Sequence, residues 1–136
     1  PICVPARASF ATGLPVHKNR LWDNAMPYYG QLPSWGHMLQ KVGVSVESIG
    51  KLHYRKQDDN DGFDKKHIPM MVYKGVGMVW GSIRRESERM SRDQRMLGEY
   101  IGPGNSNYTD YDEAVVKETI SWFKNKSKQN PSNHTK

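Results

Sequence analysis

A helix-to-strand unit in the first third of the sequence constrains its fold more than any other feature. Residues 34–43 carry apolar side chains at i, i+3, i+4 and i+7, the spacing of one helix face: Trp35, Met38, Leu39 and Val42. Ser34 can cap this helix and Gly43 can end it. Residues 44–49, "VSVESI", then favour a short strand. We therefore expect a core-facing helix followed by a strand, the building unit of α/β layers.

The only cysteine stands at the start of another predicted helix, in "CVPARASFATG". A lone Cys3 forms no internal disulfide, and no second cysteine is present for a structural zinc site. Pro5 suits a first helical turn and Gly13 a C-cap. The free N–H groups of a helix start, with Arg7 one turn on, favour a phosphate or sulfate. The Cys-x3-Arg spacing is too short for the Cys-x5-Arg cradle of a cysteine phosphatase.

Most of the remaining segments are predicted to be loops. Residues 14–33 are rich in Pro, Gly, Asn and aromatic residues, which indicates an irregular, ordered loop. Residues 54–68 are polar, and their "DDNDG" lacks the spacing and final Glu of an EF-hand, so a surface turn is favoured over a calcium loop. The glycines of residues 75–81 do not fit a dinucleotide fingerprint, and residues 84–97 are expected to be an exposed segment.

A third helix is predicted towards the end of the sequence. Residues 102–107, "GPGNSN", form a loop, and Thr109 with Asp112 gives a start that resembles a capping box. The helix is expected from about residue 110 to residue 126. It carries one apolar stripe, formed by Val116, Ile120 and Phe123.

Much of the positive charge lies in a polar tail at residues 124–136. The formal net charge is +6, and four lysines lie in this tail: Lys124, Lys126, Lys128 and Lys136. A solvated tail is favoured over a nucleic-acid arm, and a basic polyanion-binding module remains the alternative outside enzymes. No apolar run approaches the roughly 18 residues that cross a bilayer. We expect neither nucleic acid nor membrane as a partner, and the compartment stays open, with the cytoplasm slightly favoured over the periplasm or secretion.

The opening motif Cys3-x-Pro5-x-Arg7-x-x-Phe10-x-Thr12-Gly13 resembles the signature of the sulfatases of the alkaline-phosphatase-like superfamily. The stretch Gly50-Lys51-Leu52-His53 resembles the G-K-x-H element of that family. Residues 21–55 resemble the branch that contains the bacterial choline sulfatases. Ala6 departs from the family, in which serine is frequent at this position. The likeness is dense over residues 1–55 and thinner to about residue 123.

This resemblance implies a fold and a chemistry. The fold would be α/β, part of an alkaline-phosphatase-like α/β/α sandwich with a mixed sheet. Cys3 would be oxidised to formylglycine by a formylglycine-generating enzyme. That residue would bind a divalent cation, usually Ca²⁺, and attack the sulfur of a small-molecule or saccharide sulfate ester.

The resemblance also implies roles for four other residues. Arg7 would hold the oxygens of the nucleophile, Lys51 would neutralise charge on the sulfate, and His53 would take a proton as the sulfated intermediate collapses. Asn24, in "WDN", would contact the substrate. Lys51 and His53 lie two apart in a segment expected to be extended, so their side chains should leave by the same face.

We expect residues 1–136 to be a fragment of one catalytic domain, with a motif-rich core at residues 1–55. The tandem aspartates, the later metal-binding pair and the second lysine of the family have no match in the sequence. The fragment should therefore turn over little substrate by itself. Missing strands would expose apolar surface, so we expect it to be stable only in a longer protein or in an oligomer, homo-oligomers included. A formylglycine-dependent phosphonate or phosphate ester hydrolase is the alternative within the superfamily.

Overall fold

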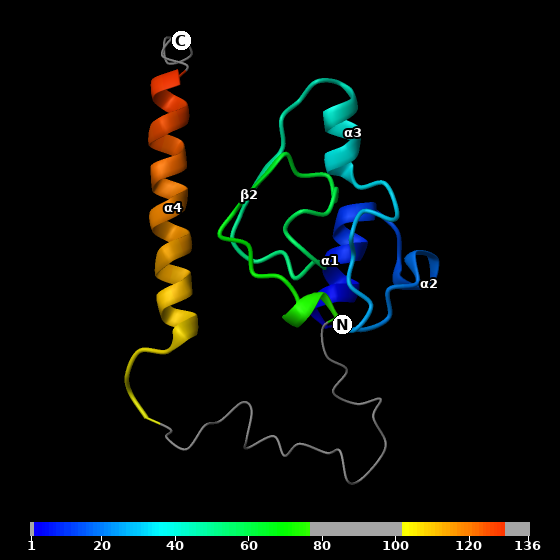
Figure 1. Ribbon diagram of the computed structural model, residues 1–136, viewed down its shortest axis with the longest axis horizontal. Helices are drawn as coiled ribbons and strands as arrows, with labels where there is room; N and C mark the ends of the chain where they lie inside the picture. The colour runs from blue at the N-terminus through cyan, green and yellow to red at the C-terminus, as the bar shows by residue number, and fades with distance from the viewer. Residues whose placement is uncertain (1, 77–101, 130–136) are drawn as a thin grey trace.

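A computed structural model describes residues 2–76 and 102–129 (Figure 1). The elements follow in the order α1 (Cys3–Thr12), α2 (Val16–Asn19), α3 (Trp35–Lys41), β1 (Glu47–Ile49), β2 (Lys65–His67), the 3-10 turn η1 (Tyr73–Gly75) and α4 (Asn107–Gln129). Helices and strands are combined, as the α/β prediction requires. Residues 84–97 and most of 75–81 lie outside the described residues, and so do the predictions made for them.

The two strands pair in parallel, with Glu47 opposite Lys65 and Ile49 opposite His67. They are the whole sheet within residues 2–76 and 102–129. The strand expected at residues 44–49 is confirmed for its last three residues, whereas β2 falls in a segment expected to consist of turns. The pairing continues beyond the strands, because the N–H of Gly50 donates to the His67 carbonyl oxygen at 3.0 Å. The segment after β1 is therefore held beside the segment after β2.

The core lies between α1 and the chain that follows β1. Its buried members are Ala8, Ala11, Leu21, Tyr28, Leu52 and Tyr54. The rings of Tyr28 and Tyr54 meet edge to face, with 4.9 Å between their centroids. The small alanine side chains on the inner face of α1 let the segment that follows β1 approach the helix closely. Since Leu52 and Tyr54 flank His53, core packing fixes the segment that carries the G-K-x-H element.

Helix α1 and the loop after it agree with the sequence. The helix begins at Cys3 and ends at Thr12, and Gly13 caps it in the left-handed region at φ 68°. The ordered, irregular loop at residues 14–33 is confirmed, with the one-turn helix α2 added. Asn19 fastens this loop, because its amide donates to the Leu14 carbonyl oxygen at 3.1 Å and its oxygen accepts from the Leu21 N–H at 2.9 Å.

Helix α3 has the predicted cap but not the predicted buried face. The Ser34 hydroxyl oxygen accepts from the His37 N–H, as expected of an N-cap. The core assignment is wrong, since all four residues of the apolar stripe are exposed: Trp35 by 39%, Met38 by 53%, Leu39 by 39% and Val42 by 73%. The helix instead packs through Gly36, where a Cβ would overlap the Gly62 carbonyl oxygen. A glycine at this contact lets the helix lie directly on the backbone of the neighbouring turn.

Helix α4 is longer than predicted at both ends. Ser106, rather than Thr109 with Asp112, caps it, because the Ser106 hydroxyl oxygen accepts from the Thr109 N–H at 3.2 Å. No Gly or Pro interrupts residues 107–129, so the helix runs on to Gln129. The tail expected at residues 124–136 is thus helical up to residue 129, and residues 130–136 lie outside the described chain. No helix among the described residues is both long and apolar enough to span a bilayer.

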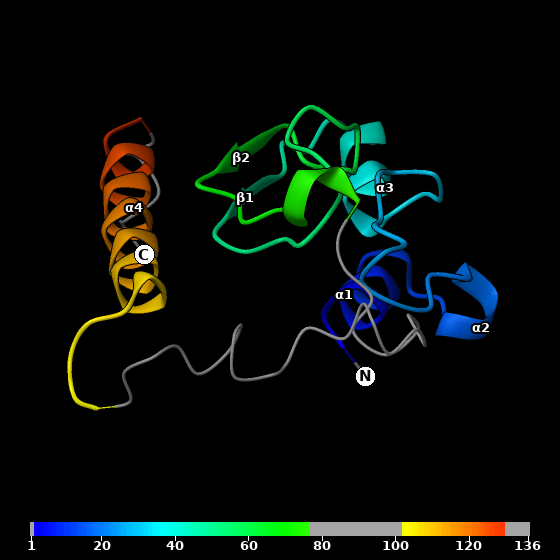
Figure 2. The same cartoon turned by 60° about the horizontal axis from the view of Figure 1, so that its bottom comes forward.

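Helix α4 lies beside the sheet, on the side away from α1 (Figures 1 and 2). Polar side chains of the helix make hydrogen bonds and ion pairs across this contact. The Glu47 carboxylate accepts from the Trp122 indole at 2.9 Å and pairs with the Lys126 ammonium at 2.8 Å. The His67 ring bridges Glu47 and Glu118, at 2.8 Å from each. The predicted stripe of Val116, Ile120 and Phe123 is exposed by 49% or more.

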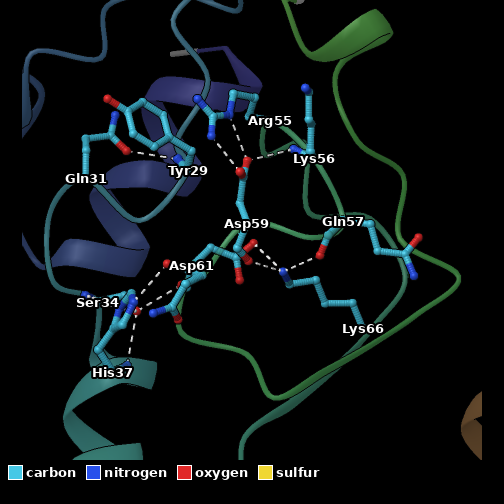
Figure 3. A network of polar contacts seen from close by, with 11 residues as sticks. Tyr29, Gln31, Ser34, His37, Arg55, Lys56, Gln57, Asp59, Asp61 and Lys66 are labelled. Atoms are coloured by element: carbon cyan, nitrogen blue, oxygen red, sulfur yellow. Dashed lines mark hydrogen bonds and ion pairs between the residues drawn. The ribbon is translucent and has the colours of Figure 1, made fainter.

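The "DDNDG" segment encloses a lysine ammonium (Figure 3). The Lys66 Nζ donates to the carbonyl oxygens of Gln57 and Asp59, at 2.7 and 2.6 Å. It also pairs with the buried Asp61 carboxylate at 3.1 Å. The predicted turn is present, but its centre is buried around an internal cation.

Candidate functional site

Three of the residues singled out from the sequence meet at the start of α1. The half-buried Cys3 is the first residue of this helix. The Lys51 ammonium lies 3.9 Å from the Cys3 Sγ, across 48 residues of sequence. Arg7, one turn along α1, donates from Nη1 to the Lys51 backbone oxygen at 2.7 Å. Two cationic side chains from separate segments thus flank the cysteine.

His53 is held next to these cations in an uncommon backbone conformation. Its φ of 58° lies in the left-handed region, where histidine is several-fold enriched over most residues. Its N–H donates to the Met70 carbonyl oxygen at 2.7 Å. The extended geometry expected for this segment is therefore wrong at His53, and this hydrogen bond, rather than a strand, fixes the backbone that carries the ring.

The His53 ring is suited to accepting a proton. Its Nδ1 is buried and has no hydrogen-bond partner among the described residues. Burial, followed by the charges of Lys51 and Arg7, lowers the pKa of His53 below its usual 6.5. The imidazole is consequently neutral at neutral pH, which a general base requires.

Asn24 reaches the same helix start from the loop after α2. Its side-chain oxygen accepts from the Val4 N–H at 2.9 Å. Asp23 fixes the turn that presents Asn24, because its carboxylate accepts from the Ala25 N–H at 2.8 Å. All five residues expected to act in catalysis or binding therefore belong to α1 or to segments that contact it.

A shallow hollow of about 430 Å³ opens at this place, lined by Ile2, Cys3, Ala6, Arg7 and Phe10. Its walls are apolar except at Arg7 and Cys3. A hollow of about 410 Å³ elsewhere, beside Tyr29 and Lys41, contains none of the predicted residues. The nitrogens of His37 in that second hollow bond to Ser34 and to the Asn60 carbonyl oxygen. The hollow at Cys3 is thus the better candidate for chemistry.

The residues that the structure describes do not complete a metal site. Within residues 2–76 and 102–129, no group of three or more His, Cys, Asp or Glu side chains could hold a metal ion. Oxygen-rich sites for Ca²⁺ take six to eight ligands. A cation at Cys3 would therefore need ligands from elsewhere.

Two backbone carbonyls complete the site, and neither was predicted from the sequence. The Lys51 oxygen holds Arg7, and the Met70 oxygen holds His53. Every residue type has a carbonyl, so no motif or spacing marks either position. The sequence carried no signal for Met70, because the strand pairing that leads residues 67–72 past residues 50–54 was itself not predicted.

The geometry at Cys3, a helix start with an arginine fork and an ammonium around a cysteine, is suited to an oxyanion. The choline-sulfatase of Rhizobium meliloti (strain 1021) is 30% identical over 119 residues, or 85% of this chain and 23% of that protein. The arylsulfatase K of Danio rerio is 37% identical over 54 residues, and that of Gallus gallus is 35% identical over 54 residues. These two matches each cover 40% of this chain and 10% of the relative.

These matches relate the chain to the sulfatase family. No family model matches the sequence. The chain spans about a quarter of the length of the choline-sulfatase and a tenth of the arylsulfatases. Residues that complete a sulfatase active site in those relatives can therefore lie outside the matched part.

Proposed function

We propose that the chain belongs to a sulfuric ester hydrolase that acts through a formylglycine made from Cys3. The observation that carries the proposal is the 3.9 Å approach of the Lys51 ammonium to the Cys3 Sγ, on a helix whose Arg7 is fixed by the Lys51 carbonyl oxygen. When present, the formylglycine supplies an oxygen nucleophile at the place of the sulfur. Lys51 and Arg7 suit that place, because both favour negative charge on oxygen.

Arg7 and Lys51 would stabilise negative charge on two different groups. The Arg7 guanidinium keeps further N–H donors after one has bonded to the Lys51 carbonyl oxygen, and these would orient the oxygens at position 3. The Lys51 ammonium would neutralise the sulfate that is transferred. Both groups are fixed before substrate binds, which avoids reorganisation during the reaction.

His53 and Asn24 would complete the set. The neutral His53 ring would take a proton from the oxygen at position 3, in the step that releases sulfate. The Asn24 oxygen is bonded to the Val4 N–H, which leaves its amide hydrogens for an oxygen of the substrate. The cation of the family, expected to be Ca²⁺, would bind through position 3 with ligands outside the described residues.

The substrate class follows from the relatives. The name of the choline-sulfatase indicates a small, cationic alcohol, and we propose a small-molecule or saccharide sulfate ester for this protein. The described part would be one portion of an alkaline-phosphatase-like α/β/α sandwich, with the motif-rich core at residues 1–55.

The decisive experiment combines modification with turnover. The complete protein that contains this chain is produced with and without a formylglycine-generating enzyme, and the peptide that contains Cys3 is analysed by mass spectrometry after an aldehyde-specific tag. Hydrolysis of an aryl sulfate is measured on the same samples, with Cys3→Ala as the control. A tagged aldehyde together with turnover that Cys3→Ala abolishes would support the proposal. A thiol at position 3 despite an active modifying enzyme would refute it.

The phosphonate or phosphate ester hydrolase remains the second candidate, because an arginine fork and an ammonium also suit phosphate oxygens. A matched pair of an aryl sulfate and an aryl phosphodiester separates the two candidates. A higher kcat/KM for the sulfate supports the sulfatase, and a higher value for the phosphodiester supports the alternative. The polyanion-binding module is less favoured, since Lys126 of the presumed tail is paired with Glu47.

A further inference from the structure

The first turn of α1 lacks the cap that its own sequence would normally supply. The N-cap residue is Ile2, which has no polar side chain, and the first turn contains no acidic residue. Pro5 has no N–H to satisfy. A helix that starts without a capping oxygen leaves its first N–H groups unpaired and tends to fray.

Asn24 provides the missing oxygen from 20 residues away. Its Oδ1 accepts from the N–H of Val4 at 2.9 Å. Val4 is the second helical residue after Ile2, the position whose N–H a capping side chain usually bonds. Asn24 thus occupies the place of a capping side chain, although it belongs to another segment.

The loop that carries Asn24 is itself fixed on both sides. Leu21 is only 7% exposed and belongs to the core cluster, together with Ala8 and Ala11 of α1. Asp23 closes an Asx turn with the Ala25 N–H, and its carbonyl oxygen accepts from the Met26 N–H at 3.2 Å. This anchoring gives the hydrogen bond from Val4 a fixed acceptor.

We infer that Asn24 is a positioning residue for Cys3: its side-chain oxygen holds the first turn of α1, and thereby the reacting group at position 3, against Lys51 and Arg7. The inference rests on the proposed function. It differs from the substrate contact proposed above, which uses the amide hydrogens of Asn24 and not its oxygen. Since Val4 follows Cys3 directly, a loosened Val4 N–H would let the group at position 3 move away from Lys51.

Two substitutions distinguish the role of the Asn24 side-chain oxygen from the role of its amide hydrogens. Asn24→Asp keeps an oxygen acceptor for Val4 and removes the amide hydrogens, whereas Asn24→Leu removes both. Asn125→Leu is the matched control, because Asn125 is an exposed residue of α4 and makes no part of the proposed site. The measurements are the amide hydrogen exchange rate of Val4 and the kcat and KM for an aryl sulfate, all on the complete protein after formylglycine formation.

We expect exchange at Val4 to be about fivefold faster in Asn24→Leu, the fold-change that corresponds to a lost cap, and unchanged in Asn24→Asp. We expect kcat to fall about 10-fold to 100-fold in Asn24→Leu, because the reacting group at position 3 is then misplaced. In Asn24→Asp, most of the parent kcat should be retained. Loss of the amide hydrogens should appear as a higher KM in both variants. Asn125→Leu should match the parent protein in every measurement.

Two results would overturn the inference. If exchange at Val4 is the same in Asn24→Leu and in the parent, the oxygen does not hold the helix start. If Asn24→Asp restores slow exchange but loses as much kcat as Asn24→Leu, Asn24 acts on catalysis through its amide hydrogens alone. Should the parent protein show no sulfatase turnover, the proposed function fails, and exchange at Val4 still decides whether Asn24 caps the helix.

Discussion

The Lys51 ammonium and the Cys3 Sγ lie 3.9 Å apart, although 48 residues separate them in the sequence. An ammonium placed beside the first residue of a helix combines two sources of positive potential, the charge and the free N–H groups of the helix. This combination suits an oxyanion independently of any turnover. Binding of inorganic sulfate is therefore a direct probe of the arrangement.

Lys51→Met should weaken the binding of inorganic sulfate about 10-fold or more, because a hydrogen bond to a charged group contributes about 1.5–3 kcal/mol. Isothermal titration of the parent and the variant measures the change. Lys117→Met is the matched control, since Lys117 lies on α4 and its side chain is 79% exposed. Equal sulfate affinity of Lys51→Met and the parent would contradict the arrangement.

His53 should titrate with a pKa below 6.5. Its burial, followed by the charges of Lys51 and Arg7, disfavours the imidazolium. Because the unfolded chain then binds more protons than the folded one, stability should fall as pH is lowered through this range. NMR titration of the ring gives the midpoint, and Lys51→Met should move it upwards. A midpoint above 6.5 in the parent would argue against a neutral base.

Arg7→Lys should reduce kcat/KM for an aryl sulfate about 100-fold or more. A lysine has no planar fork, so it cannot bond to the Lys51 carbonyl oxygen and to an oxyanion in the same geometry. Arg20→Lys is the control, because Arg20 is exposed and lies outside the site. Activity of Arg7→Lys within twofold of the parent would remove Arg7 from the proposed machinery.

Lys66→Met should destabilise the fold by about 3–5 kcal/mol, since it leaves the buried Asp61 carboxylate without its cation. Burial raises the pKa of Asp61, and Lys66 opposes that rise. The variant should therefore regain stability as pH falls and Asp61 becomes protonated. Urea unfolding at several pH values measures this, and the double variant Lys66→Met/Asp61→Asn should be more stable than Lys66→Met alone. A pH-independent loss would contradict the mechanism.

Helix α4 should detach from the sheet as Glu47 is protonated. Hydrogen bonds from Lys126, His67 and Trp122 lower the pKa of Glu47 from 4.5 to about 2. The contribution of this carboxylate is therefore complete above pH 4.5 and is lost as pH falls towards 2. The indole NMR signal of Trp122 should report the change, and Glu47→Gln should produce it at neutral pH. Glu113→Gln, on an exposed part of α4, should leave the signal in place.

The sequence predicted the parts of the site that depend on local chemistry. Pro5 and Gly13 bracket a helix for reasons within the segment, and Cys3 and Arg7 then lie one turn apart. It also predicted that Ser34 caps α3. The resemblance to a family motif predicted that Lys51 and His53 belong to the same site. The extended geometry assumed for this segment was wrong at His53, because a hydrogen bond to the Met70 carbonyl oxygen, and not a strand, fixes its backbone.

Burial could not be predicted in the same way. The apolar stripes of α3 and α4 have the correct spacing, yet Met38 is 53% exposed and Phe123 is 63% exposed. The periodicity of a sequence shows which helix face is apolar. Whether that face is buried depends on another segment packing against it, which periodicity does not reveal. Helix α4 is instead attached through Glu47, whose partners Trp122 and Lys126 lie 75 and 79 positions further along the chain. No local pattern marks such distant polar partners.

The hydrogen bond from Arg7 to Lys51 ends on a main-chain oxygen. Replacement of the side chain at position 51 would therefore leave the attachment of α1 intact. A substitution at position 51 can therefore remove the ammonium beside Cys3, while the arginine keeps its orientation. Position 51 thus has two separable parts: its main chain holds the helix, and its side chain alone supplies the charge next to Cys3.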